Sequence, residues 1–240
     1  MKILGIDTSA LVATVALCED EKPLAVYSQK CGLTHSQTML PMVKNVLDNT
    51  DTSIDDIDMI AVSEGPGSFT GIRIGISTVK GLAFGKNKIC IGVSTLEAMA
   101  RTVAEFCTDA IICPVMDARR NQLYNALFLC ESGKLTRICE DRLVSVFDLE
   151  EELKKYSDKK IYLCGDGYDI AKNAFTTVKT ENTPLISQYQ SAYSVALGAL
   201  EIAKQELLTT DIELSPVYLR ASQAERERLE KLEAGKKKEV

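Results

Sequence analysis

The sequence predicts an α/β protein of two similar lobes, each built from a β-β-β-α-β-α-β-α unit. Stretches with strand-like apolar patterns are interleaved with stretches of helical periodicity along the chain. The order of these stretches restarts near residue 109, and turn signals recur at corresponding places in the two halves. With 240 residues, the chain is long enough to give each half its own core.

The first half contains one complete unit. Its strands are short apolar runs that end at turn-forming residues. Its helices place apolar residues on one face at about 100° per residue. The elements expected in order are strands at 2–8, 11–18 and 23–30, a helix at about 35–49, a strand at 58–63, a helix at 71–85, a strand at 89–93 and a helix at 94–107.

The second half repeats two motifs of the first. ILGIDTSALVATVALCEDEKPLAV resembles CPVMDARRNQLYNALFLCESGKLTRI, which aligns Asp7 with Asp117. IAVSEGPG resembles IYLCGDG, which aligns the glycines of SEGPG with Gly165 and Gly167. The alternative is a chance similarity between two α/β halves.

The repeat divides the chain into three parts. We expect an N-terminal lobe at 1–108, which contains the two helices discussed below, and a C-terminal lobe at 109–220. The remaining segment, 221–240, is expected to be a charged tail.

The composition excludes some classes of function. With 45% apolar residues, 26% charged residues and a net charge of −6, the chain has no broad attraction for nucleic acid or anionic lipid. No apolar run approaches the roughly 20 residues that span a bilayer, and the N-terminus does not resemble a signal peptide. The eight cysteines form no C-x-x-C pair. We therefore expect a cytoplasmic protein with reduced and mostly buried thiols.

The loop SEGPGSFTGIRIG, residues 63–75, raises the question of phosphate binding. Its glycine spacing fits neither the Walker A pattern nor the dinucleotide pattern G-x-G-x-x-G, so it predicts at most weak anion binding at a helix N-terminus. In the helix, one face carries few large side chains, which indicates that another backbone packs close to it. The residues of that face are Gly71, Gly75, Thr78, Leu82 and Gly85. That backbone belongs either to the same lobe or to a helix of another chain.

The preceding helix has a wide apolar face. Its apolar residues spread over about 160°, whereas a single core requires a stripe of about 100°. Methionines at the margin of such a face suit an adaptable contact surface. Extra core and a partner surface both explain this pattern. The residues in question are Met39, Leu40, Met42, Val43, Val46 and Leu47.

Catalytic side chains are scarce. His35 is the only histidine, and no G-x-S-x-G elbow occurs. Asp7 and Asp117 end corresponding strands and are candidates to organise a Mg²⁺–nucleotide complex, but no glycine follows either of them. We expect no metal site, no cofactor and at most a vestigial nucleotide site. The residues of that site are Asp7, Thr8, Ser9, Asp117, Arg119, Gly165 and Gly167.

Two such units side by side resemble the actin, hexokinase and Hsp70 ATPase superfamily, in which each half opens with a strand ending in Asp. The motifs GIDTS, GPGSFTGIRIGIS, IGVSTLEAM, MDARR and SPVYLR together resemble the TsaB family, also called YeaZ. The similarity runs from residue 1 to about 220, and GPGSFTGIRIG is long enough to be highly specific.

The resemblance implies a non-catalytic subunit, or pseudoenzyme. TsaB-like proteins form a heterodimer with the paralogous TsaD, which transfers a threonylcarbamoyl group to adenosine 37 of tRNAs reading ANN codons, and the ATPase TsaE joins them. Thr95 and Met99 stand where TsaD-like proteins carry metal-binding histidines, and neither is a credible ligand. The alternative is a stand-alone enzyme of the same fold, either a small-molecule kinase or a metallopeptidase. A stand-alone RNA-binding protein conflicts with the acidic balance.

The resemblance also implies where the partner binds. In TsaB-like proteins the two helices described above contact TsaD or a second copy of the same protein, so tRNA is reached only through the complex. The bare glycines then serve helix approach at this interface. The expected interface residues are His35, Met39, Met42, Val43 and Val46 of the first helix and Gly71, Ile74, Gly75, Thr78 and Leu82 of the second.

Overall fold

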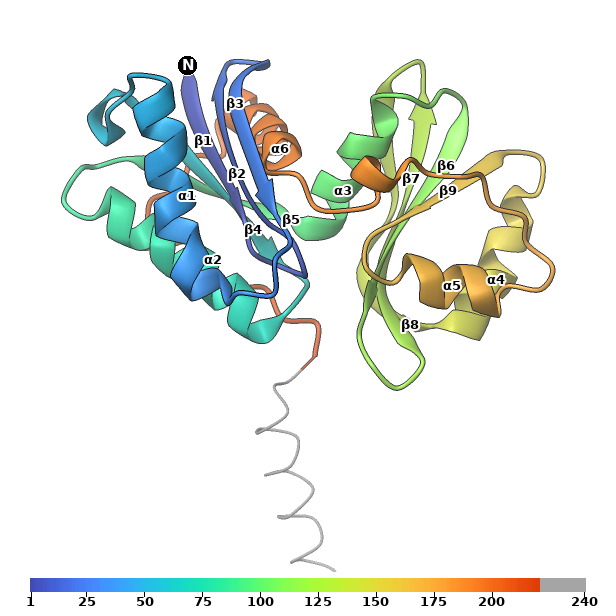
Figure 1. Cartoon of the computed structure of the whole chain (residues 1–240). Helices are drawn as coiled ribbons and strands as arrows, with labels where there is room; N and C mark the ends of the chain where they lie inside the picture. The colour runs from blue at the N-terminus through green and yellow to red at the C-terminus, as the bar shows by residue number, and fades with distance from the viewer. Residues whose placement is uncertain (221–240) are drawn as a thin grey trace, which may run out of the picture.

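The computed structural model describes residues 1–220, which form two α/β lobes side by side (Figure 1). The fold class predicted from the sequence is confirmed. The predicted charged tail at 221–240 lies outside the described residues. No helix in the described part of the chain is long and apolar enough to cross a membrane. The elements in chain order are β1 (Lys2–Asp7), β2 (Ala13–Glu19), β3 (Lys22–Gln29), α1 (His35–Asn49), β4 (Met59–Gly65), α2 (Phe69–Ala83), β5 (Ile89–Ser94), α3 (Thr95–Ala104), β6 (Ala110–Asp117), β7 (Gln122–Glu131), β8 (Lys134–Ser145), α4 (Val146–Leu153), β9 (Lys160–Cys164), α5 (Tyr168–Ala174) and α6 (Ala192–Lys204).

The first lobe is a five-stranded sheet with the strand order β3-β2-β1-β4-β5. β1 pairs antiparallel with β2 and parallel with β4, so the carboxyl ends of β1 and β4 meet at the same edge. Both faces of the sheet are covered, by α1 and α2 on one side and by α6 on the other. Because both faces are covered, the central strands are almost continuously apolar.

The second lobe is a four-stranded sheet with the order β8-β7-β6-β9. α4 and α5 cover one face and α3 covers the other (Figure 1). α3 precedes the predicted boundary at residue 109 but packs on the second sheet, and α6 follows it but packs on the first. Residue 109 therefore separates the two sheets, whereas each core includes one helix from the other half of the chain.

The second unit lacks the last strand that the repeat predicts. In its place, Glu181 makes a single bridge with Tyr162, and its N–H donates to the Ile161 carbonyl at 2.8 Å. The segment TTVKTENTPLIS at 176–187 is rich in polar residues and contains a proline. Such a segment lacks the apolar run that a buried parallel strand requires.

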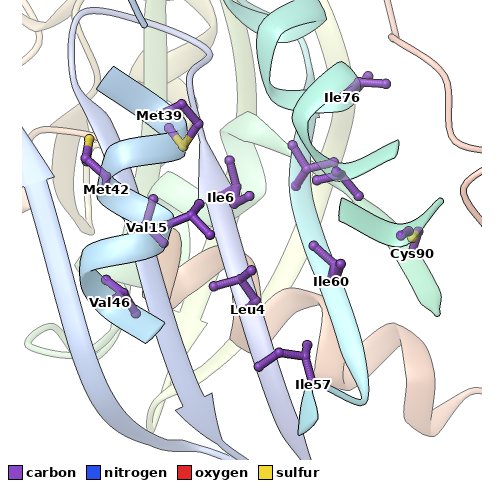
Figure 2. Close-up of a cluster of buried hydrophobic side chains, with 14 of the residues drawn as sticks. Leu4, Ile6, Val15, Met39, Met42, Val46, Ile57, Ile60, Ile76 and Cys90 are labelled. Atoms are coloured by element: carbon purple, nitrogen blue, oxygen red, sulfur yellow. The ribbon is translucent and has the colours of Figure 1, made fainter. Parts of the chain in front are cut away.

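The wide apolar face of α1 belongs to the core of the first lobe. Met39 is 1% exposed, Met42 3%, Val43 2% and Val46 3%. Figure 2 shows Met39, Met42 and Val46 among the buried side chains of the sheet, including Val15. The lobe itself already covers these four side chains, as the extra-core alternative expects, whereas Leu40 of the same face is 55% exposed. Contact of this face with a partner stays a prediction.

Candidate functional site

A cleft of about 390 Å³ opens between the lobes, where turns from both sheets meet. The turns that follow β1, β4, β6 and β9 form its walls together with the chain beyond α6. Ser9, Asp117 and Arg119 of the predicted nucleotide site line this cleft. The described residues that line it are Ser9, Ala10, Leu11, Pro66, Gly67, Ser68, Phe69, Met116, Asp117, Ala118, Arg119, Tyr124, Asp166, Val217, Tyr218, Leu219 and Arg220.

Asp7 ends β1 next to the cleft but is wholly buried. Its Oδ1 accepts hydrogen bonds from the backbone N–H and the hydroxyl of Ser9, each at 2.7 Å. Its Oδ2 accepts one from the Ser63 hydroxyl. Burial raises the pKa of Asp7, and these donors oppose that shift. One oxygen therefore holds the turn after β1, and the other ties the end of β1 to Ser63 of β4.

The turn after β1 packs directly against the glycines of α2. A Cβ at Gly71 would lie 2.1 Å from the Thr8 carbonyl oxygen, and one at Gly75 would lie 2.6 Å from Thr8 Oγ1. Thr8 Oγ1 donates to the Gly71 carbonyl at 2.7 Å, and the Ser68 N–H donates to the Ser9 carbonyl at 2.7 Å. The close backbone thus belongs to the same lobe. The lack of side chains at Gly71 and Gly75 therefore serves packing within the lobe, and their contact with a partner stays a prediction.

In the second lobe, Asp117 ends β6 and faces the cleft. Its Oδ1 accepts a hydrogen bond from the Arg119 N–H at 2.7 Å, and its Oδ2 lies 3.2 Å from the exposed Arg119 guanidinium. The Asp117 N–H donates to Asp166 Oδ1 at 3.2 Å, and burial raises the pKa of Asp166. Asp166 was absent from the predicted site. Its position between Gly165 and Gly167, two residues of that site, was the sequence signal that could have included it.

The glycines near the cleft serve packing within their own lobes. A Cβ at Gly165 would lie 2.1 Å from the Val115 carbonyl oxygen, to which the Gly167 N–H donates at 3.0 Å. Of the described lining residues, Gly67 is the sole glycine, and a Cβ there would lie 2.5 Å from the Ser9 carbonyl oxygen. The described cleft therefore presents carboxylates and an exposed guanidinium, without a glycine-built cradle of free N–H groups for phosphates.

The chain beyond α6 closes one side of the cleft. The Tyr218 ring stacks on Phe69 of the first lobe, with 4.6 Å between ring centroids. The Arg220 guanidinium donates to the Ala118 carbonyl of the second lobe at 2.7 Å. Residues 217–220 thus contact both lobes. The sequence marked this segment only through the motif SPVYLR.

A hollow of about 550 Å³ lies between α1 and α2, and we call it the α1–α2 groove. Ile74 and Thr78 of the predicted interface line it, together with the buried Met39. Leu40, which belongs to the predicted wide apolar face of α1 but not to the expected interface residues, is 55% exposed at this groove. The lining residues are Ser36, Met39, Leu40, Phe69, Thr70, Arg73, Ile74, Ser77 and Thr78.

Two other predicted interface residues lie away from the groove lining. His35 Nε2 is 2.7 Å from the Ala10 carbonyl oxygen, so the imidazole fastens α1 to the turn after β1. Leu82 is partly buried and packs against the core of the first lobe. Neither side chain lines the α1–α2 groove.

The segment IGVSTLEAM, which the resemblance aligns with the metal-binding histidines of TsaD-like proteins, lies in the core. Thr95 and Met99 are both fully buried in α3, and the Met99 sulfur is 3.5 Å from Gln190 Nε2. Within residues 1–220, no three His, Cys, Asp or Glu side chains come together as metal ligands do.

Comparisons with known proteins agree on one family. The family described as TsaD, tRNA N6-adenosine threonylcarbamoyltransferase, matches residues 25–228. The tRNA threonylcarbamoyladenosine biosynthesis protein TsaB of Bacillus subtilis is 31% identical over 226 residues, which are 94% of this chain and 96% of that protein. The Escherichia coli protein of the same name is 41% identical over 124 residues, covering 52% of this chain and 53% of that protein.

A solved structure has the same fold. It is described as an uncharacterized protein with similarity to peptidase YeaZ from Pseudomonas aeruginosa, with a TM-score of 0.76 and 24% identity. The match covers 91% of this chain and 99% of that chain, and at this identity it shows the fold alone. The sequence match to TsaB of Bacillus subtilis, which covers nearly the whole length of both chains, also shows the family. The chain belongs to the TsaB (YeaZ) family of tRNA threonylcarbamoyladenosine biosynthesis proteins.

Proposed function

We propose that this chain is the non-catalytic partner of a TsaD-class transferase and binds it through the α1–α2 groove. The observation that carries the proposal is the groove itself. Leu40 is 55% exposed there, and Ile74 and Thr78 are half-buried beside it, although the core beneath is complete. An apolar hollow on the surface of a well-packed lobe is typical of a protein-binding site.

The TsaD family match supports a partner with the same architecture. It spans residues 25–228, which include both helices of the groove. We expect a transferase of this family to have a helix pair in the corresponding place. Two such pairs packed against each other bury both apolar faces in one interface, as in a pseudo-symmetric dimer.

The cellular role follows from that partner. The transferase attaches a threonylcarbamoyl group to adenosine 37 of tRNAs reading ANN codons, and this chain contacts tRNA only through the complex. The ATPase TsaE is the third component. In the absence of the transferase, a second copy of the chain is an alternative occupant of the groove. The complex acts in the cytoplasm.

The test is a reconstituted reaction. The purified chain, the TsaD-class transferase and TsaE are mixed with unmodified tRNA, ATP and a threonylcarbamoyl donor. Mass spectrometry of the digested tRNA then measures threonylcarbamoyladenosine with each protein omitted in turn. Unchanged modification without this chain would contradict the proposal.

Ile74→Glu is expected to weaken association with the transferase by about tenfold or more, because it replaces an apolar side chain of the groove by a carboxylate that loses its hydration on binding and competes with the partner for Arg73. Phe147→Glu is the matched control, since Phe147 is 68% exposed on α4 of the other lobe. Calorimetric titration measures both affinities, and thermal unfolding checks that both variants fold. Equal loss of binding in the two variants would remove the groove from the interface.

The isolated chain is expected to hydrolyse no ATP above background, because Asp7 faces its own turn and the described cleft lacks a glycine-built phosphate cradle. The alternative function, a kinase or metallopeptidase, requires tight binding of ATP–Mg²⁺ or Zn²⁺ by the chain alone. Equilibrium binding and a coupled ATPase assay measure both. Saturable hydrolysis that disappears in Asp117→Asn would favour the enzyme.

A further inference from the structure

Arg73 stands at the edge of the α1–α2 groove with its guanidinium held in place. Its Nε donates to the Tyr218 hydroxyl at 2.8 Å. The guanidinium carbon lies 3.9 Å from the centre of the Phe69 ring, and that ring stacks on Tyr218. A residue of α2 and a residue of the chain beyond α6 thus fix the position of this cation.

The two terminal nitrogens of Arg73 are unused in the described part of the protein. Apart from the bond to Tyr218, the Arg73 guanidinium makes no ion pair or hydrogen bond with residues 1–220. By contrast, Arg101, Arg137 and Arg142 each pair with a carboxylate. An exposed guanidinium that is already ordered loses little freedom when it binds a carboxylate through both terminal nitrogens.

The groove supplies no acid to neutralise this charge. Of the described residues that line it, Arg73 alone is charged. α2 contains no acidic residue at all. On the exposed side of α1, Asp48 already pairs with Lys44. The groove therefore presents an apolar surface with one unpaired positive charge to whatever docks there.

We propose that the α1–α2 groove takes a helix of the partner protein that carries an aspartate or glutamate among apolar residues, and that this carboxylate pairs with Arg73. Tyr218 is the positioning residue for that pair, since its hydroxyl and ring hold the guanidinium at the edge of the groove. The inference rests on the proposed function, because it takes the groove as the docking site, and it adds the chemistry of the docked element.

The same charge disfavours a second copy of this chain. In a two-fold symmetric dimer formed through the groove, both Arg73 side chains enter one interface, and neither copy's α2 brings a carboxylate. Repulsion between like charges grows as salt is removed, whereas attraction to a partner carboxylate also grows. Salt therefore shifts the two kinds of association in opposite directions.

The experiment is calorimetric titration of the full chain with the TsaD-class transferase at about 50 mM and about 500 mM salt. We expect the wild-type complex to weaken with salt. Arg73→Gln should weaken it by about tenfold or more at low salt and remove most of the salt dependence. Lys155→Gln makes the same change in net charge at an exposed position of the other lobe and should alter the affinity by less than about twofold.

Two further variants test the geometry. Arg73→Lys should restore part of the affinity, since an ammonium keeps the charge but cannot pair through two nitrogens. Tyr218→Phe keeps the aromatic stack and loses the hydroxyl that holds Nε, so its affinity should fall between those of the wild type and Arg73→Gln. Thermal unfolding of each variant confirms that the fold is intact. A Tyr218→Phe affinity equal to that of the wild type would overturn the positioning role.

The remaining outcomes separate the inference from the proposed function. Equal binding by Arg73→Gln and the wild type would overturn the inference and leave the docking site in place. A wild-type chain that does not bind the transferase would overturn both. Light scattering on the chain alone tests whether a second copy of the chain occupies the groove. Self-association that tightens at low salt and disappears in Arg73→Gln would assign the groove to a second copy and overturn the inference.

Discussion

Gly71→Ala is expected to destabilise the first lobe by about 3 kcal/mol or more. The new Cβ would lie 2.1 Å from the Thr8 carbonyl oxygen. The crowded atom of Thr8 is backbone, not the flexible end of a side chain, so α2 or the turn after β1 has to move. That movement breaks the hydrogen bond from Thr8 Oγ1 to the Gly71 carbonyl, which spans 2.7 Å in a buried environment.

Gly81 in the same helix is the matched control. Nothing lies within 4 Å of the position a Cβ would take at Gly81, and the residue is exposed. Gly81→Ala should stabilise the protein by up to about 1 kcal/mol, because alanine is the better helix former. Urea unfolding followed by circular dichroism gives both values. If Gly71→Ala proved as stable as the wild type, the turn after β1 would be able to leave α2 at little cost.

Glu150→Ala is expected to cost about 3 kcal/mol of unfolding free energy, because it leaves several donors without an acceptor. Glu150 is 6% exposed, and its Oε1 accepts hydrogen bonds from the backbone N–H groups of Thr176, Thr177 and Val178 at 2.6, 2.6 and 3.3 Å. The Thr177 hydroxyl donates to the same oxygen at 2.9 Å. One carboxylate thus shapes the chain that follows α5. Urea unfolding at neutral pH measures the loss.

The same contacts predict a pH dependence. Hydrogen bonds from Thr177 and its neighbours lower the pKa of Glu150 from 4.5 to about 2. Because the pKa of the folded state is the lower one, the contribution of Glu150 to stability is complete above the unfolded value. It is lost as the pH falls from about 4.5 towards 2.

Glutamine at this position separates the charge from the shape of the side chain. Between about pH 5 and pH 3, the wild type should lose more stability than Glu150→Gln, which has no carboxyl group to titrate there. Glu151→Gln is the control, since Glu151 is exposed and pairs only with Lys154 among the described residues. An identical pH profile for Glu150→Gln and the wild type would show that this carboxylate does not set the acid stability.

The sequence by itself determined the elements of the first lobe and the family. The helix expected at 71–85 is observed at Phe69–Ala83, and the strand expected at 58–63 is observed at Met59–Gly65. These features depend on residues close together in the chain, namely apolar periodicity and turn formers. The family followed from a contiguous motif, GPGSFTGIRIG, for the same reason.

Only the tertiary structure decided which element packs against each apolar helix face and against the glycine face of α2. The pattern of Gly71 and Gly75 showed that a backbone comes close to α2, but that backbone is Thr8, 63 residues before Gly71 in the chain. The α1 face that includes Met42 faces the sheet, and α3 and α6 pack on the sheets of opposite lobes. Apolar periodicity predicts that one face of a helix is buried, but it does not predict which other element packs against that face. The neighbour is chosen by how elements distant in sequence fill one core together.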